Sequence, residues 1–203
     1  MSFKQKISGK YQIQTVNEMS DWFEKRTSLH IGLVKKYIGK IIELNLPEID
    51  SKLLEAEKEH DSSKFMEPEY TPYVHTTWKY KQKRLGGDYE IPEDMKKKTD
   101  EATFHHIKSN RHHPEYWDDK VKPNCLNSQD RDKPSDNMTD ATKMPLTYIG
   151  SMMADWLAMS EEKHTNVNDW IKNNVNIRWK FTPKQVELIH KIAKSVTVDK
   201  LEN

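Results

Sequence analysis

The feature that most constrains this chain is a histidine-rich segment, FHHIKSNRHHPEYW, at residues 104–117. It holds four of the nine histidines of the protein: His105, His106, His112 and His113. A cluster this dense has no ordinary explanation in a hydrophobic core, whereas imidazole groups are common ligands of divalent metals. The sequence therefore predicts a metal centre that the rest of the chain has to assemble.

The spacing of these histidines limits which of them can share one ion. Adjacent residues on a helix point about 100° apart, so His105 and His106 cannot both face one metal squarely. His105 and His112 are seven residues apart, as are His106 and His113, and each pair shares a side if the helix continues that far. One pair could bind an ion while the other binds a second ion, supports the ligands or contacts a substrate phosphate.

Three other segments place possible ligands on or beside apolar helical faces. His30 lies within an apolar helical stripe over residues 20–42, and the pair His60–Asp61 closes a predicted helix over residues 49–60. Asp155 interrupts the apolar face MMADWLAM of a further predicted helix. A carboxylate on such a face is costly unless it is paired or bound to a metal. In chain order these residues read H…HD…HH…HH…D, which favours one centre built from separate elements.

Each of these residues taken alone has a simpler interpretation. His30 would be a satisfied core histidine, and His60 would lie at a helix C-terminus, where the helix dipole favours it. Asp155 would form an ion pair or lie on the surface. His75, His164 and His190 have no partner in the pattern, and we predict them on the surface.

The remaining segments predict a single all-α domain over residues 1–203 with long irregular parts. Residues 1–18 are polar and predict an arm or a short strand. Residues 71–97 contain Pro72, Gly86, Gly87 and Pro92, which are expected to break helices, and they predict a loop or hairpin insertion over the site. Residues 118–143 are polar and predict a second, lid-like or disordered insertion. Further helices are predicted to begin near Asp100, Pro145, Asn166 and Thr182.

Composition excludes several classes of protein. The net charge is +1, with 33 Lys and Arg against 32 Asp and Glu, so nothing global indicates a polymeric nucleic acid or an anionic membrane as partner. The basic and aromatic run WKYKQKR at residues 78–84 could stack a base and hold phosphate, although a solvated hairpin is the favoured interpretation, because short lysine-rich runs are common. A single cysteine, Cys125, excludes an internal disulfide bond. No apolar run reaches a membrane-spanning length, and we expect a cytoplasmic protein.

The segment EHDSSK at residues 59–64 resembles the His-Asp-x-x-Lys turn of the HD-domain superfamily of metal-dependent phosphohydrolases. More closely, EHDSSKF, HHIKSNRHHPEYW and MMADWLAM resemble an uncharacterised HD-like family of bacteria and bacteriophages, known only as a domain of unknown function. The resemblance covers roughly residues 25–195. It implies an HD-like helical bundle around one or two divalent ions, in the host cytoplasm if the protein is encoded by a phage.

The resemblance also implies how the ions would be held. In the one-metal type, His30, His60, Asp61 and Asp155 would be the ligands. In the two-metal type, Asp61 would bridge the ions and histidines within residues 105–113 would hold the second. Neither type identifies the metal, which could be Mn, Fe, Co, Mg, Ni or Zn.

The activity implied is metal-assisted hydrolysis of a nucleotide or another small phosphoester, with hydroxide generated on the metal. Asp61 would be ligand and orienter, and Lys64 and Arg111 would neutralise phosphate charge. Asn110 and Glu115 would support the ligands or act as a general acid. Two alternatives stay open: an HD-type di-iron oxygenase and a non-catalytic phage binding protein. The sequence does not settle whether the protein forms homo-oligomers.

Overall fold

The computed structural model describes residues 3–122 and 138–196, and gives only the backbone for the part before Val16. Within these residues there are seven α-helices, two short 3₁₀-helices and two strands of two residues each. The predicted all-α class is therefore confirmed. None of the helices in the described ranges is both long enough and apolar enough to cross a lipid bilayer.

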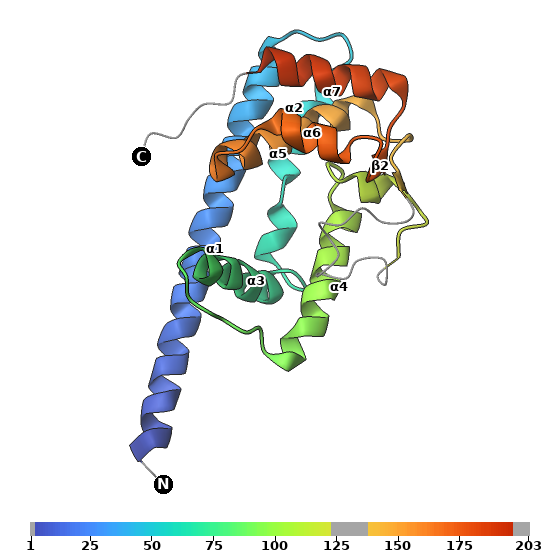
Figure 1. Ribbon diagram of the computed structural model, residues 1–203. Helices are drawn as coiled ribbons and strands as arrows, with labels where there is room; N and C mark the ends of the chain where they lie inside the picture. The colour runs from blue at the N-terminus through green and yellow to red at the C-terminus, as the bar shows by residue number, and fades with distance from the viewer. Residues whose placement is uncertain (1–2, 123–137, 197–203) are drawn as a thin grey trace.

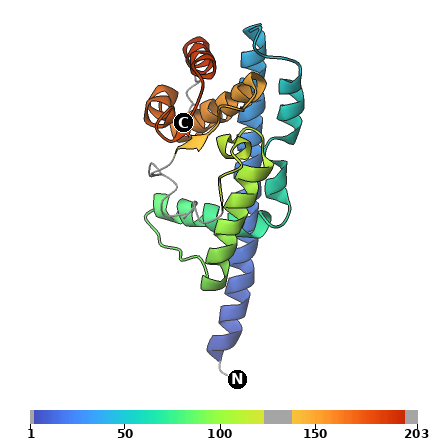
Figure 2. The ribbon, with the colours of Figure 1, turned by 90° about the vertical axis from the view of Figure 1, so that its right-hand side faces the viewer.

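Helix α1 runs from Phe3 to Glu43 and is the longest element of the fold. Its first part projects beyond the other helices in both views (Figures 1 and 2). The prediction of an arm or short strand over residues 1–18 is wrong for residues 3–18, which are helical. The chain has no proline before Pro47, and extending an existing helix costs far less than nucleating one. The helix therefore continues in both directions from its apolar stripe.

The core lies between α1 and α5, which spans Leu146–Lys163. The inner face of α1 buries Val34, Tyr37, Ile38 and Ile41, as the apolar stripe predicted. Helix α5 is buried on most sides, and α7 (Pro183–Ser195) packs against it. Helix α6 (Val167–Asn174) lies between α5 and α7 in the chain and also contacts α5.

The predicted caps of the last two helices are confirmed. The side chain of Asn166 accepts a hydrogen bond from the backbone N–H of Asn168 at the start of α6. Thr182 and Gln185 form a reciprocal capping box at the start of α7. The side-chain amide of Gln185 also donates to the backbone oxygen of Met144, which fixes α7 against the entry to α5.

The predicted loop insertion over residues 71–97 is wrong, because the structure places helix α3 at Tyr70–Arg84 and begins helix α4 (Glu93–Ser109) within it. Pro72 lies in the first turn of α3, where a backbone N–H has no helical partner, so it does not break the helix. Tyr73, Val74 and Trp78 form the inner face of α3 and pack with Met19 and Phe23 of α1. The basic run at residues 78–84 is therefore helical and not a hairpin.

Helix α2 (Lys52–Glu59) packs against α5 and leads into the 3₁₀-helix η1 (Ser62–Phe65). After α4 the chain forms a second 3₁₀-helix, η2 (Pro114–Trp117). Strand β1 (Thr139–Asp140) pairs in parallel with β2 (Trp179–Lys180). Of the insertion predicted over residues 118–143, residues 123–137 lie outside the described part of the chain. Its described ends are held together, because the Asp118 carboxylate accepts a hydrogen bond from the backbone N–H of Asp140.

Candidate metal centre

The fold brings His30, His60, Asp61 and Asp155 together, as predicted. His30 lies on the buried face of α1, and its Nε2 is 3.0 Å from Oδ1 of Asp155 on α5. His60 Nε2, at the end of α2, is 3.8 Å from the same oxygen. Oδ2 of Asp61 is 3.8 Å from His30 Nε2 and 3.7 Å from His60 Nε2. Ligand atoms from three separate helices and the turn after α2 thus surround one small space.

The position of Asp61 depends on an unusual backbone conformation. Its φ of 57° and ψ of 10° lie in the left-handed region, which aspartate tolerates better than most side chains. This single residue turns the chain sharply between α2 and η1. The turn directs the carboxylate into the bundle, where it is only 1% exposed.

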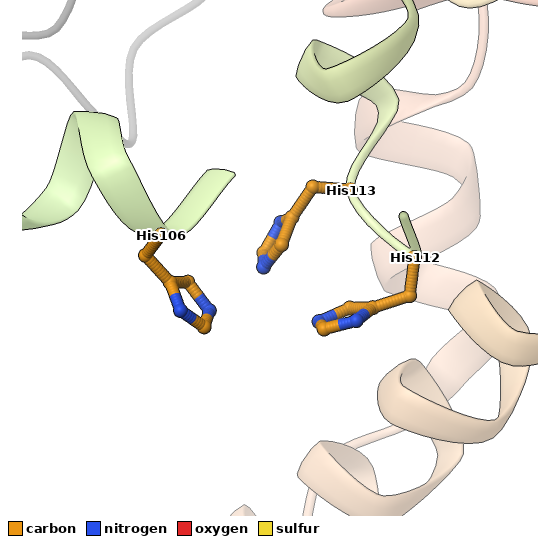
Figure 3. A group of neighbouring side chains, drawn as sticks. All are labelled: His106, His112 and His113. Carbon is orange, nitrogen blue, oxygen red and sulfur yellow. The ribbon is translucent and has the colours of Figure 1, made fainter. Parts of the chain in front are cut away.

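A second group of ligand atoms lies on the other side of Asp61. It consists of His106 on α4 and of His112 and His113 in the turn that follows, and Figure 3 shows their three rings facing a common space. Asp61 Oδ1 is 3.2 Å from His106 Nε2 and 3.7 Å from His112 Nε2. One oxygen of Asp61 therefore faces each group.

Burial and charge set the protonation of these side chains. Burial is the main cause that lowers the pKa of His60 to about 4 and that of His112 well below its ordinary value, so both rings are neutral at pH 7. Burial alone would raise the pKa of Asp61, but the charges of Lys64 and of the neighbouring histidines outweigh it and lower this pKa well below its ordinary value. Neutral imidazole and ionised carboxylate are the forms that bind a metal.

The buried atoms of the centre also fit a cation. Both ring nitrogens of His60 and Oδ1 of Asp61 are buried without a hydrogen-bond partner among the described residues. Buried polar atoms rarely lack a partner in native proteins, and a metal ion would supply one. Three groups of three residues each bring their ligand atoms within 4.8 Å of one another. These His and Asp groups can hold a metal ion.

Comparison with known proteins places this centre within a family. The family described as "Family of unknown function (DUF5662)" matches residues 19–196, a range that contains every ligand named above. The chain belongs to this family. No curated protein and no solved structure was found to match it. The resemblance of this DUF5662 chain to the HD-domain superfamily accordingly stays a prediction.

Two carboxylates that the sequence did not indicate orient the histidines of the DUF5662 chain. Glu69, which is fully buried, lies 2.8 Å from Nδ1 of His106 and 2.7 Å from Nδ1 of His105. Glu162 Oε2 is 3.4 Å from Nδ1 of His30. The contacts with His106 and His30 leave Nε2 of these two rings directed at the centre. Glu162 follows Asp155 by seven residues, so its helical phase was a usable signal, whereas nothing in the sequence marked Glu69.

The other predicted site residues have different places. His105 is exposed and its ring contacts Glu69, so the prediction that it binds metal is not supported by its position. Lys64 Nζ lies 2.5 Å from Oδ2 of Asp61, at the edge of the centre. Arg111 is exposed and donates to the Tyr148 hydroxyl. Glu115 is buried and accepts a hydrogen bond from the Trp179 indole, and its predicted role as a supporting group or general acid stays a prediction.

The side-chain amide of Asn110 lies 3.1 Å from Nδ1 of His106 and donates to Ser63 Oγ, which is consistent with the predicted supporting role. His164 and His190 are exposed, as predicted. His75 is half-buried and contacts the Tyr89 hydroxyl, so for this histidine the prediction of a surface position is only partly met.

Proposed function

We propose that this protein is a metal-dependent phosphohydrolase whose centre holds two divalent ions. The observation that carries the proposal is the Asp61 carboxylate, because its two oxygens face two separate groups of histidines. His30, His60 and Asp155 would hold one ion together with Asp61. His106, with His112 or His113, would hold the other. A carboxylate shared between two ions is the arrangement expected of a two-metal hydrolytic site.

When bound, divalent ions lower the pKa of a coordinated water and withdraw charge from a phosphoryl oxygen. The protein's own side chains would do the remaining work. His60 and His112 are neutral at pH 7, so their lone pairs are available as ligands. The charges of Lys64 and of the neighbouring histidines keep Asp61 ionised, and burial holds its carboxylate in place. The Lys64 ammonium, 17% exposed at the edge of the centre, would offset negative charge on a phosphoryl oxygen.

The test compares two single variants after loading with Mn, Co, Fe or Mg. Asp61→Asn keeps the shape of the side chain but removes the bridging charge, and it should reduce phosphate release from small phosphoesters by about a hundredfold or more. His190→Gln alters an exposed histidine of α7 and should leave the rate unchanged. Circular dichroism and metal content by mass spectrometry would accompany both assays.

Each possible result has a definite meaning. Release of phosphate by the wild type and by His190→Gln, with loss in Asp61→Asn, supports the proposal. A protein that holds two metal equivalents and releases phosphate from no ester contradicts it. Oxygen-dependent consumption of an organic substrate by the iron form would assign the centre to the di-iron oxygenases instead. Biological activity that survives Asp61→Asn would identify a binding protein.

A further inference from the structure

A pocket of about 170 Å³ opens directly beside the candidate metal centre. His60 and His112 form part of its wall, and the centres of their two rings are 4.1 Å apart. Both histidines are proposed ligands. A molecule bound in this pocket would therefore lie next to the ions, in a position suited to a substrate.

The lining of the pocket is rich in hydroxyl and amide groups. It includes Ser62, Ser63, Ser109, Ser151, Asn110 and Tyr148. Groups of this kind recognise hydroxyls by donating and accepting hydrogen bonds. Tyr148 is the only lining aromatic residue other than histidine among the described residues, and its ring already contacts Trp117. The pocket thus offers partners for a polyol and little apolar surface for a flat base.

Charged residues of the pocket indicate where an anion would lie. Arg111 is the only Lys or Arg in the described lining, and it is the residue next to His112. Its guanidinium donates to the Tyr148 hydroxyl at 2.8 Å and lies 5.7 Å from the centre of that ring, which fixes its orientation. The guanidinium also forms a hydrogen bond with Tyr116, so two of its five N–H donors are used. The remaining donors can bind the oxygens of a phosphate, while the Glu59 carboxylate can accept from hydroxyls.

The volume of the pocket limits the size of the ligand. A cavity of about 150 Å³ accommodates benzene, and pockets for drug-sized ligands measure about 300–1,000 Å³. Within this volume there is space for a short polyol or a single sugar ring, and the base of a nucleoside would have to extend out of the open side of the pocket. Resting on the proposed function, we infer that the substrate is a small hydroxylated phosphate monoester without a base, its phosphate between Arg111 and the metal centre and its hydroxyls on the serines.

A matched pair of esters tests this inference. Ribose 5-phosphate and adenosine 5′-monophosphate share the sugar and the phosphoester and differ by the base. The metal-loaded protein should hydrolyse ribose 5-phosphate with a kcat/KM at least about tenfold higher than that for adenosine 5′-monophosphate, because the sugar and phosphate fill the pocket and leave no space inside it for the base. Equal rates, or a preference for the nucleotide, would overturn the inference.

Two variants test the pocket itself. Ser109 is an exposed lining residue, so Ser109→Trp should fill the pocket without disturbing the core. Arg111→Gln should raise KM about tenfold or more and change kcat little, because a charge-assisted bond present in the ground state is removed. Arg111→Lys should restore part of the loss. Arg84→Gln, on the exposed end of α3, is the matched control and should leave KM unchanged.

Calorimetry separates this inference from the proposed function. If no ester is hydrolysed with any metal, the hydrolase proposal fails, but binding of ribose 5-phosphate to the metal-loaded protein can still be measured. Binding that is weakened at least about tenfold in Ser109→Trp supports the pocket as the ligand site. Absence of binding, or binding that is unchanged in Ser109→Trp, overturns it.

Discussion

At the scale of single residues, the buried carboxylate of Glu69 determines which nitrogen of His106 faces the centre. Burial raises the pKa of Glu69, but hydrogen bonds with His106 and His105 outweigh it and lower the pKa overall, so the group is ionised. It accepts from Nδ1 of His106 and leaves Nε2 directed at Asp61. Glu69 should therefore act as a positioning residue for the second ion.

Glu69→Gln should weaken the binding of the second ion by about 10–100-fold, the usual effect of losing a carboxylate behind a ligand histidine. The first ion, held by residues that Glu69 does not contact, should bind as before. Competition with a chromophoric chelator would resolve the two affinities. His105→Gln is the control, because His105 contacts the same carboxylate but lies exposed and away from the ligand atoms. Two unchanged affinities in Glu69→Gln would remove its assigned role.

Several residues of the candidate centre could be predicted from the sequence because they contradict their local setting. Asp155 interrupts an apolar helical face, and His60–Asp61 follows directly on a helix end. Glu69 gave no such sign, because its pairing with His106 joins residues 37 positions apart through tertiary packing. Which of the clustered histidines reach the centre depends on where helix α4 ends, and the sequence did not fix that position. Helix α4 ends at Ser109, and the turn after it brings back His112 and His113.

At the scale of elements, helices were predicted correctly from the sequence wherever the apolar residues recurred at helical spacing. The prediction failed where proline and glycine residues suggested loops. Helix α3 was missed because Pro72 was read as a breaker, although the first turn tolerates it. The helical start of α1 was missed because residues 3–18 lack a clear apolar period. Local helix propensity and continuation from a stable helix make such segments helical, and neither produces a periodic pattern of apolar residues in the sequence.

The contact between α2 and α5 supplies a prediction at this scale, because α2 leads into His60 and Asp61. A Cβ atom on Gly150 of α5 would lie 2.8 Å from Cδ1 of Ile49 and 3.6 Å from Cδ2 of Leu53. Gly150→Val should therefore destabilise the protein by about 1–3 kcal/mol through overpacking. It should also weaken metal binding, because displacing α2 moves two ligands.

Gly39 of α1 is the matched control, since no atom lies within 4 Å of an added Cβ there. Gly39→Ala should stabilise the protein by about 0.5–1 kcal/mol, because alanine loses less conformational entropy in a helix. Urea unfolding measures both changes. A Gly150→Val protein as stable as the wild type would show that α2 does not pack tightly on α5.

At the scale of the whole molecule, the candidate centre joins helices α1, α2, α4 and α5, so a metal ion bound there would couple its binding to folding stability. A ligand that binds only the folded state stabilises it by an amount that grows with the ratio of ligand concentration to Kd. In the unfolded chain the candidate ligands are not held together, so the unfolded chain cannot bind the ion with the same affinity. Chelation should therefore lower Tm, and the size of the effect should depend on pH.

The sign of that dependence follows from His30. Burial lowers the pKa of His30, but its hydrogen bonds with Asp155 and Glu162 outweigh burial and raise the pKa to about 9 in the metal-free protein. The raised pKa stabilises the metal-free fold fully below pH 6.5, and this contribution is lost as the pH rises through 9. A metal ion has to displace the same proton, so its affinity should increase by about tenfold per pH unit up to pH 9.

Between pH 6.5 and 8.5 the Tm of the metal-free protein and the Tm of the metal-loaded protein should consequently diverge. The Tm of the metal-free protein should fall over this range, while the increase in Tm on adding a fixed metal concentration should grow by about 5–10 °C, which corresponds to a hundredfold gain in affinity. His60, with a pKa of about 4, is neutral in the folded protein over this whole range and therefore adds no slope to the metal affinity. Scanning calorimetry with and without chelator measures both curves. Parallel curves would mean that no ion displaces the proton of His30, whereas a divergence that disappears in His30→Gln would assign the coupling to this one side chain.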